Sequence, residues 1–533
     1  MTASLNGSID IASEARRRRT FAVISHPDAG KSTLTEALAL HARVIGEAGA
    51  VHGKTGRRGV VSDWMEMERQ RGISITSAAL QFGFGDAVIN LVDTPGHADF
   101  SEDTYRVLAA VDCAVMLSDA ARGLEPQTLK LFDVCRHRGI PVITFVNKWD
   151  RPGKHPLELC DELHERIGLR PAPLTWPVGE AGHFAGLLDV RSGEMLSYAR
   201  SAGGATISAQ QRLSSAQAAD DHGDEWTTAL EESALFDPVD TEEFRAGAAT
   251  PVLFGAAVAN VGVRQLLETL VELAPMPSAR VDVDESPRDV EAPFSGLVFK
   301  VQAGMDPSHR DRVAFVRVCS GRFERGEVVT LARTRRPFAT KYAQAIFGQA
   351  RETLDVAYPG DIVGLVNASS LTPGDTLYDG AAVRFPPMPA FAPEHFVVCR
   401  AADTSKSKQF RRGIEQLEQE GVVQVLRSDL RADAAPILAA VGPLQFDVAA
   451  HRLTHEFRAP VHVDRLPYSV ARRTRREDEP ILEREHGVEV ARRGDGALLA
   501  LFLDRRRLGS VRRAHPNLML EPLVAAGGDA ADS

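Results

Sequence analysis

A run of residues with phosphate-binding chemistry lies near the start of the chain: Ser25, His26, Pro27, Asp28, Ala29, Gly30, Lys31 and Ser32. It follows the apolar stretch Phe21 to Ile24 and precedes the helix-like segment Thr33 to Leu40. Where a buried strand turns sharply into a helix, backbone N–H groups and the helix N-terminus face an anion. Lys31 adds a positive charge, and the Ser32 hydroxyl can bind a magnesium ion that bridges the phosphates. The segment therefore predicts a phosphate-binding loop, with Ser25 where the usual pattern has glycine.

A second group of polar residues ends another apolar run. The residues Ala87 to Val92 read as a buried strand, and they are followed by Asp93, Thr94, Pro95 and Gly96. Ligands of open parallel sheets bind at the carboxyl ends of the strands. We expect Asp93 to hold the magnesium ion through water and the Gly96 N–H to meet a terminal phosphate.

A third motif supplies base recognition. The apolar run Ile140 to Val146 is followed by Asn147, Lys148, Trp149 and Asp150. The Asp150 carboxylate can accept hydrogen bonds from the N1–H and the 2-amino group of guanine, and adenine has neither donor there. Asn147 and Lys148 would brace the loop and cover the base. Three such motifs in this order, each at a strand end, predict a GTPase.

The elements that must position these motifs alternate between strand and helix from about residue 20 to 278. Further strands are expected at Cys113 to Leu117 and Pro251 to Phe254, and helices at Pro126 to Arg136 and Val263 to Leu273. This alternation predicts a doubly wound α/β domain. Residues 201–250 carry ten Asp or Glu and only two Arg. We interpret the stretch near 200–250 as an acidic surface insertion with a solvated, partly mobile face.

The rest of the chain changes character after a proline-rich linker at 279–293. Short apolar runs separated by Gly and Pro turns predict a β-barrel domain over 294–390. A mixed pattern then predicts an α+β domain of the split βαβ type over 391–520. Residues 1–19, with Arg16 to Arg19, read as a solvated basic lead-in, and 521–533 as a tail. The fold class is thus multidomain: an α/β P-loop GTPase domain, a β-barrel and an α+β domain.

Composition limits the other possibilities. Of the 533 residues, 44% are hydrophobic, yet no segment approaches the roughly 18 uninterrupted apolar residues of a membrane span. Five scattered cysteines favour reduced thiols that serve packing, and hence a cytoplasmic location. The net charge of −10 argues against indiscriminate nucleic-acid binding but allows a local basic face. Candidate patches are Arg310 with Arg312, Arg411 with Arg412, and Arg472, Arg473, Arg475 and Arg476.

The segment between the first two motifs points to a family. Residues 62–76 read SDWMEMERQRGISIT, and the second motif continues as His97, Ala98, Asp99 and Phe100. These residues resemble the translational GTPases, and SHPDAGK with DWMEMERQRGISIT is most similar to the bacterial peptide chain release factor 3 family. The barrel segment 300–317, KVQAGMDPSHRDRVAFVR, supports that resemblance. It covers about residue 18 to beyond 460.

The resemblance implies a ribosome-dependent GTPase of translation termination that promotes departure of the stop-codon-reading release factors after peptide release. GTP or GDP and Mg²⁺ are the implied cofactors, and the ribosome with its RNA and those release factors are the implied partners. No membrane partner is expected, and a monomer is the default. His97 matches the family's catalytic histidine, which orients the attacking water.

Two positions depart from the family pattern. Ser74 occupies the place of the switch threonine that senses magnesium, and Thr76 could serve instead. Gly255, Ala256 and Ala257 follow the last strand where related GTPases often have Ser-Ala, so any contact with the base must come from backbone N–H groups.

Four other classes of protein explain the sequence less well, and an ATPase is the weakest of them because Asp150 is in place. A translocase like elongation factor G carries further domains, and too little chain follows Leu466 for them. A carrier like elongation factor Tu would end in a second barrel, which the mixed pattern after residue 400 does not support. A module that binds GTP without hydrolysing it does not need Lys31, Asp93 and His97 together.

Overall fold

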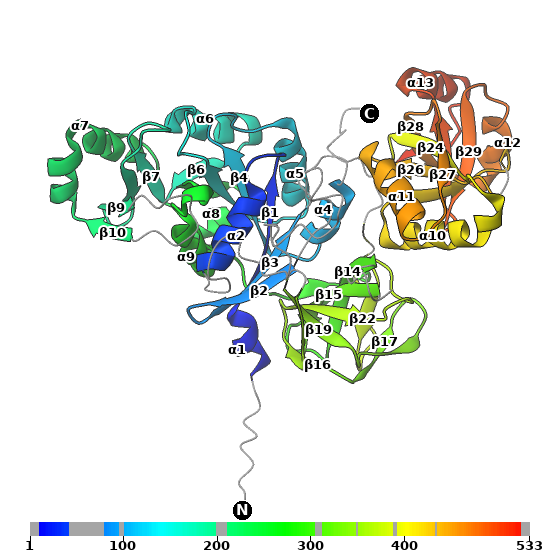
Figure 1. Ribbon diagram of the computed structural model, residues 1–533, viewed down its shortest axis with the longest axis horizontal. Helices are drawn as coiled ribbons and strands as arrows, with labels where there is room; N and C mark the ends of the chain where they lie inside the picture. The colour runs from blue at the N-terminus through cyan, green and yellow to red at the C-terminus, as the bar shows by residue number, and fades with distance from the viewer. Residues whose placement is uncertain are drawn as a thin grey trace, which may run out of the picture.

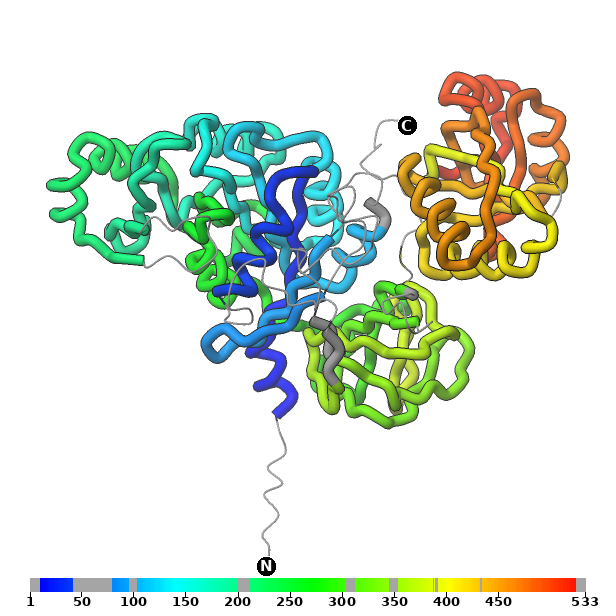
Figure 2. Tube along the Cα trace, viewed as in Figure 1, coloured from blue at the N-terminus to red at the C-terminus, as the bar shows by residue number. Residues whose placement is uncertain are grey.

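The computed structural model describes residues 10–41, 79–94, 101–198, 210–303, 312–347, 350–386, 388, 392–431 and 434–523. The described chain forms three bodies that follow one another in sequence (Figures 1 and 2). An α/β body runs from the blue N-terminal end to the green helices, a β body lies below it, and a second α/β body lies to one side.

The first body is built on a seven-stranded sheet of order β2-β3-β1-β4-β5-β11-β6. Except for β2, which pairs antiparallel with β3, its neighbours are parallel. A parallel sheet is covered on both faces, so its strands are apolar along their length, and every residue of β1 is buried. The strands are β1 (Arg18–Ser25), β2 (Ala79–Phe84), β3 (Ala87–Asp93), β4 (Cys113–Asp119), β5 (Val142–Asn147), β6 (Arg170–Pro173) and β11 (Ala249–Phe254).

Helices cover this sheet on both faces. Two separate hydrophobic clusters flank it: one contains the apolar residues of α2 and α9, and the other those of α4, α5 and α6. The doubly wound α/β architecture predicted from the sequence is confirmed. The helices are α1 (Ile11–Arg16), α2 (Lys31–His41), α4 (Ser101–Leu108), α5 (Pro126–His137), α6 (Pro156–Ile167) and α9 (Val263–Leu273).

The acidic stretch is more ordered than the sequence suggests. Its described part forms β10 (Gln210–Leu213), α7 (Ser215–Ser233) and α8 (Thr241–Arg245), and β10 completes a four-stranded sheet with β7 (Thr175–Val178), β8 (Gly186–Asp189) and β9 (Glu194–Tyr198). Trp226 of α7 is 1% exposed and belongs to the main core cluster. The acidic residues are solvated, as expected, but the apolar side of α7 is part of the domain core.

The basic lead-in is another correction. Arg18 and Arg19 were interpreted as solvated, but both lie in β1 and are buried. The Arg18 Nε lies 2.8 Å from an Asp361 carboxylate oxygen, and Arg19 donates to the carbonyl of Val271. Burial of these guanidinium groups is tolerated because each has oxygen partners.

The second body is an antiparallel eight-stranded sheet of order β18-β17-β23-β14-β15-β22-β19-β20 around an apolar cluster of its own, and Phe299, Phe315 and Ile362 of its strands pack into the main core cluster of the first body. The predicted barrel-like domain is confirmed. Its strands are β14 (Ser295–Ala303), β15 (Arg312–Ser320), β16 (Phe323–Glu324), β17 (Val328–Leu331), β18 (Arg336–Ala339), β19 (Ala343–Phe347), β20 (Ala350–Thr353), β21 (Val356–Ala357), β22 (Ile362–Val366) and β23 (Thr376–Tyr378). The stretch expected as a linker contains the strand pair β12 (Arg280–Val281) and β13 (Pro287–Arg288).

The third body contains two split βαβ units in succession, where the sequence predicted one such pattern. The first has the strand order β27-β24-β26-β25 and the second β29-β30-β28-β31, and β25 pairs with β29. Its elements are β24 (His395–Ala401), α10 (Ser407–Glu420), β25 (Gln424–Arg427), β26 (Ile437–Ala440), α11 (Leu444–His455), β27 (Val461–Arg465), β28 (Val470–Thr474), α12 (Glu479–Leu482), β29 (Val488–Arg493), β30 (Leu498–Phe502), α13 (Arg505–Ala514) and β31 (Glu521–Pro522).

One hydrophobic cluster joins the two units. It contains Phe396, Ile437 and Ala439 of the first unit together with Leu499 and Leu501 of the second. Each unit keeps a separate cluster beneath its own helices. The helix-free faces of the two units therefore share one core. The predicted tail begins within this fold, since β31 pairs with β28.

Buried charged groups connect the first two bodies. Arg317 of β15 is 1% exposed, donates to the carbonyl of Ala110 at 2.6 Å and forms an ion pair with Asp112 at 2.6 Å. The Thr20 hydroxyl of β1 donates to the carbonyl of Gly360 at 2.7 Å. A guanidinium buried in this way depends on its carboxylate, because an unpaired buried charge is strongly destabilising.

All three bodies meet at the last turn of α10. Arg106 of α4 approaches the carbonyls of Glu420 and Gly421 at 3.5 Å, and Arg312 of β15 donates to the side chain of Gln419. The C-terminal carbonyls of a helix carry partial negative charge, so this is a favourable place for a guanidinium. The third body is thus held by the other two at one helix end.

The Arg317–Asp112 pair gives a stability prediction. Asp112→Ala should lower the free energy of unfolding by about 3 kcal/mol, because it leaves the buried Arg317 without its carboxylate. Chemical denaturation monitored by circular dichroism measures the effect. Asp464→Ala is the matched control, since the Arg400–Asp464 pair is exposed and its loss should cost less than about 1 kcal/mol. Equal losses in the two variants would contradict the assigned role of the buried pair.

Candidate nucleotide-binding site

The candidate site residues gather at one edge of the seven-stranded sheet. The parallel registers pair Val23 with Asp93 and Asp119 with Asn147, so the strands end at nearly the same level. The loops that follow β1, β3, β5 and β11 carry the residues named by the sequence motifs. This edge is the usual ligand site of such sheets.

The phosphate loop turns through two residues with positive φ, Asp28 at 65° and Gly30 at 97°. The carbonyl of Gly30 accepts the first bond of α2, from the N–H of Leu34 at 2.9 Å. A Cβ atom at Gly30 would lie 2.5 Å from the Asn147 amide nitrogen, so glycine is required there both by the backbone and by the neighbour. Ser32 lies in the first turn of α2, as predicted.

Lys31 and Asp93 face each other across this loop. The Lys31 ammonium lies 3.3 Å from an Asp93 carboxylate oxygen, and both side chains are buried. Within the described residues, neither group has a hydrogen bond that satisfies it. Thr94 is anchored by donation from its hydroxyl to the carbonyl of Val23 at 2.6 Å. Buried charged groups without full partners are typical of a site built for a ligand.

Asn147 connects three loops. Its amide nitrogen donates to the carbonyl of Ala29 at 2.9 Å, and its amide oxygen accepts from the N–H of Ala257 at 2.9 Å. Asn147 itself ends β5 and is 2% exposed. The side chain therefore fixes the phosphate loop relative to the loop after β11, as the predicted brace requires.

The loop after β11 is used differently from the expectation. The N–H groups of Ala256 and Ala257 are already bonded, to the carbonyl of Val261 and to Asn147. In this arrangement they hold the loop and do not face a base as free donors. A Cβ atom at Gly255 would lie 2.4 Å from the Val261 carbonyl, so this position needs glycine for close packing.

Lys148 holds the opposite side of the phosphate loop. Its ammonium donates to the carbonyl of Asp28 and to the Asp119 carboxylate at 2.8 Å. Burial raises the pKa of Asp119, but hydrogen bonds from Lys148 and from the N–H of Ala121 outweigh it, and its pKa lies below the ordinary value. Asp119 is not among the residues predicted from the sequence, although a carboxylate at the end of an apolar strand is a signal for such a role.

The last two residues of the third motif have separate roles. Trp149 is fully buried, and its ring meets Phe254 edge-on at 5.1 Å between centroids. The Asp150 side chain is 30% exposed, and one of its oxygens has no partner among the described residues. Arg151 is its nearest cation, at 3.8 Å. Trp149 thus anchors the loop, while Asp150 is partly exposed and its unpartnered oxygen is buried.

The side chain of His26 is buried within the phosphate loop. It is 1% exposed, and its Nε2 lies 3.0 Å from the Glu125 carboxylate. Burial lowers the pKa of His26 below its ordinary value, despite the nearby Glu125 and Asp119 carboxylates. The neutral imidazole therefore connects the phosphate loop to the start of α5, a contact that the sequence did not suggest. The buried Ser25 hydroxyl has no hydrogen-bond partner among the described residues.

Four predicted site residues lie outside the described residues: Pro95, Gly96, His97 and Ser74. Thr76, the alternative to Ser74, does too. Among the described residues, no group of three or more His, Cys, Asp or Glu side chains could hold a metal ion by itself.

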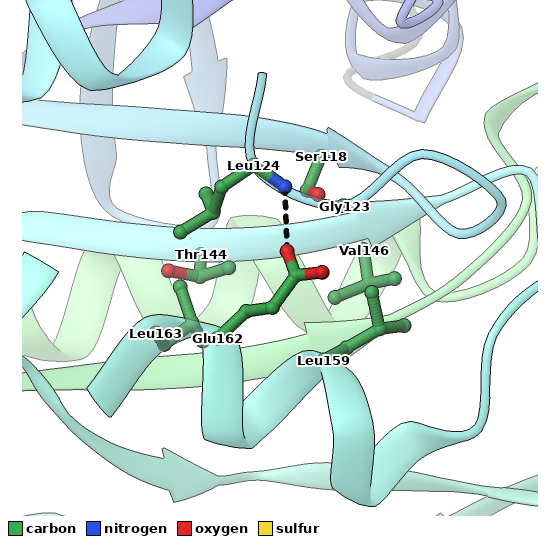
Figure 3. A pocket seen from close by; sticks show the side chains of 8 residues that line it. All are labelled: Ser118, Gly123, Leu124, Thr144, Val146, Leu159, Glu162 and Leu163. Carbon is green, nitrogen blue, oxygen red and sulfur yellow. Dashed lines mark hydrogen bonds between the residues drawn. The ribbon is translucent and has the colours of Figure 1, made fainter. Parts of the chain in front are cut away.

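A small cavity lies behind the site, between β4, β5 and α6 (Figure 3). Its volume of about 10 Å³ is close to the room for one water molecule. Glu162 points across it and accepts a hydrogen bond from the N–H of Leu124 at 2.9 Å. The cavity is too small for a nucleotide, and Glu162 serves to hold the loop that leads to α5.

Comparison with known proteins gives matches along the whole chain. The family model "Elongation factor Tu GTP binding domain" matches residues 16–276, "Elongation factor G domain 2" matches 293–380, and "Class II release factor RF3, C-terminal domain" matches 385–512. A peptide chain release factor 3 from Synechococcus elongatus is 46% identical over 97% of this chain and 95% of its own length. One from Gloeobacter violaceus is 48% identical over 87% of this chain and 88% of its own.

The fold has a solved counterpart. A crystal structure of a protein from Thermus thermophilus aligns with a TM-score of 0.68 and 21% identity, covering 90% of this chain and 72% of that one. All five cysteines are buried free thiols, consistent with a packing role. No described helix is long and apolar enough to span a membrane. With relatives this similar over nearly its full length, the chain belongs to the peptide chain release factor 3 family, and it is a GTP-binding GTPase of translation termination.

Proposed function

We propose that this GTPase is stimulated by the ribosome and promotes departure of the stop-codon-reading release factors after the peptide has been released. The observation that carries the proposal is the set of buried groups at the sheet edge, Lys31 and Asp93, which lack hydrogen-bond partners within the described residues. Such groups remain in a folded domain when a ligand completes their bonding.

The nucleotide phosphates would lie in the loop from Ser25 to Ser32. Lys31 would then meet the β- and γ-phosphates. The Asp93 carboxylate, which has no hydrogen-bond partner among the described residues, suits a magnesium ion or its bound water. Ser32 and Ser74 would supply hydroxyl ligands. When bound, the ion would neutralise charge that develops on the phosphate oxygens during transfer.

Base recognition would fall to Asp150. Its carboxylate, 30% exposed, can accept hydrogen bonds from the N1–H and the 2-amino group of guanine. Asn147 and Lys148 hold the loop from the side of the phosphates, through Ala29 and Asp28. The Gly255–Ala257 loop would act indirectly, because Ala257 fixes the amide of Asn147.

Hydrolysis is an in-line displacement at the γ-phosphorus. The oxygen of a water molecule forms the new P–O bond, and the bond to the bridging oxygen breaks, giving GDP and inorganic phosphate. His97 would orient that water, and a ribosomal contact would bring it into place. Thr94, anchored on β1, and Pro95 and Gly96 would set the start of this segment.

The step from hydrolysis to factor release requires a change in the arrangement of the domains. Helix α4 follows the His97 segment, and its Arg106 approaches the last carbonyls of α10. A shift of α4 on loss of the γ-phosphate would therefore act directly on the third body. We further propose a cytoplasmic monomer whose GTPase domain runs from β1, which begins at Arg18, to 278, with a barrel over 294–390 and an α+β domain that starts at about 391 and includes β31.

The role in termination predicts a direct assay. Addition of the protein with GTP should speed the departure of a labelled stop-codon-reading release factor from post-termination ribosomes, compared with buffer, as measured by fluorescence. Ribosome-stimulated hydrolysis without faster departure would move this GTPase to another step of termination.

Asp150 predicts a change of base preference. Asp150→Asn should weaken GTP binding by roughly 100-fold or more and favour xanthosine triphosphate, because the side-chain amide can donate to the 2-oxo group. Equilibrium binding of both nucleotides measures this. Asn147→Ala is the control: it removes the brace and should weaken both nucleotides alike. Unchanged GTP affinity in Asp150→Asn would exclude the base-recognition role.

His97 predicts a separation of binding from catalysis. His97→Ala should keep GTP affinity, yet slow ribosome-stimulated hydrolysis by roughly 100-fold, because the water loses its orienting group. Single-turnover phosphate release on ribosomes measures the rate. Normal stimulated turnover in this variant would remove His97 from the catalytic step.

A further inference from the structure

The second split βαβ unit carries an unusual concentration of arginine. Residues 470–522 contain twelve Arg and no Lys, in a chain whose net charge is −10. Five of these arginines lie within the ten residues of α13: Arg505, Arg506, Arg507, Arg512 and Arg513. Leu508 and Val511 bury the other side of that helix in the unit's core.

Some of the arginines of the unit have structural partners. Arg507 pairs with Glu485 at 2.6 Å, and Arg512 donates to the carbonyl of Leu520 at 2.8 Å. Arg506 and Arg513 differ: both are exposed, and neither forms an ion pair with any described residue. The outer side of α13 thus keeps positive charges that no carboxylate of the described fold neutralises.

Arg506 and Arg513 differ in their relation to the helix dipole: Arg506 lies in the first turn of α13, and Arg513 lies in the last turn, where positive charge is favourable. Three arginines lie in the first turn of α13, where a positive charge is unfavourable by about 0.3–1 kcal/mol. The first turn contains no acidic residue, and the side chain of the N-cap Asp504 is already bonded to the N–H of Arg507. Arg506 therefore keeps its charge at a position that reduces helix stability, and binding of an anionic partner would offset that cost.

The shape of the face favours a phosphate backbone. Arg506 and Arg513 are seven residues apart, two helical turns, and only Gly509 and Ser510 lie between them on that side. Such small residues let a partner's backbone approach the helix closely. Guanidinium groups can bind two phosphate oxygens at once, in bidentate geometry.

Other anionic partners fit less well. Between 470 and 522, a fully described stretch, the sole Phe, Tyr or Trp is Phe502, which is buried. This stretch therefore offers no such ring to stack on unpaired bases or to insert into a lipid surface.

Figure 1 shows α13 at the outer end of the third body, away from the barrel and thus open to a large partner.

We propose that the exposed side of α13, with Arg506 and Arg513, is a docking face for the phosphate backbone of double-stranded RNA. The inference rests on the proposed function, because RNA is chosen over DNA from the expected ribosomal partner. The contact is electrostatic and carries no sequence specificity.

The test uses the full-length protein, a fluorescent RNA duplex of about 20 base pairs and anisotropy at several salt concentrations. The double variant Arg506→Gln with Arg513→Gln should bind at least about ten-fold more weakly at low salt, and its log–log salt slope should be smaller by about 2. The control, Arg411→Gln with Arg412→Gln, changes two exposed arginines on α10 of the other unit and should bind as wild type does.

Three outcomes would overturn the proposal: equal RNA binding by the α13 variant and wild type, an equal loss in the control, or a loss seen only with an acidic protein or with phosphatidylglycerol vesicles. A DNA duplex of the same length distinguishes general polyanion binding from preference for the RNA helix. GTP affinity is measured in parallel and should be unchanged in both variants. If the wild-type protein failed to bind or to hydrolyse GTP, that result would instead contradict the proposed function, whatever the RNA result.

Discussion

The site depends most on the two hydrogen bonds of the Asn147 side chain. One end of this buried amide holds the carbonyl of Ala29, and the other holds the N–H of Ala257. These groups lie in loops after three strands that are far apart in sequence but parallel in the sheet. A buried amide that lost either partner would leave a polar group unsatisfied, at a cost of about 1–3 kcal/mol. The geometry around Lys31 and Asp150 therefore rests on one side chain that need not touch the nucleotide.

Buried polar contacts also join the three bodies. Arg317 connects the barrel to Asp112, and Arg106 and Arg312 converge on the end of α10. The first two bodies also share apolar packing, because Phe299, Phe315 and Ile362 of the barrel belong to the main core cluster, whereas the third body has hydrophobic clusters of its own. A separate core with polar contacts to its neighbours suits a domain that changes its position, and among the three bodies this describes the third.

The third body lies beyond the nucleotide-binding domain and contacts it through α10. Its two split βαβ units share a core formed by their helix-free faces, which leaves the helices of both units outside. As a result, α10 faces the junction with the other bodies, while α13 lies at the outer end (Figure 1). The first unit therefore contacts α4 through the end of α10, and the second unit carries the face proposed to bind an anionic partner.

Local patterns in the sequence determined the strand–loop–helix order, the three nucleotide motifs and the family resemblance, because each depends on residues close together in the chain. The bounds of α9 and the Lys31, Asp93 and Asp150 positions could be predicted for that reason. Only the tertiary structure decided that Arg18 is buried, that Asp119 holds Lys148, that Ala257 supports Asn147 and that Trp226 belongs to the core. Each of these depends on partners from distant segments, and apolar periodicity carries no information about which distant carboxylate or carbonyl will meet a given side chain.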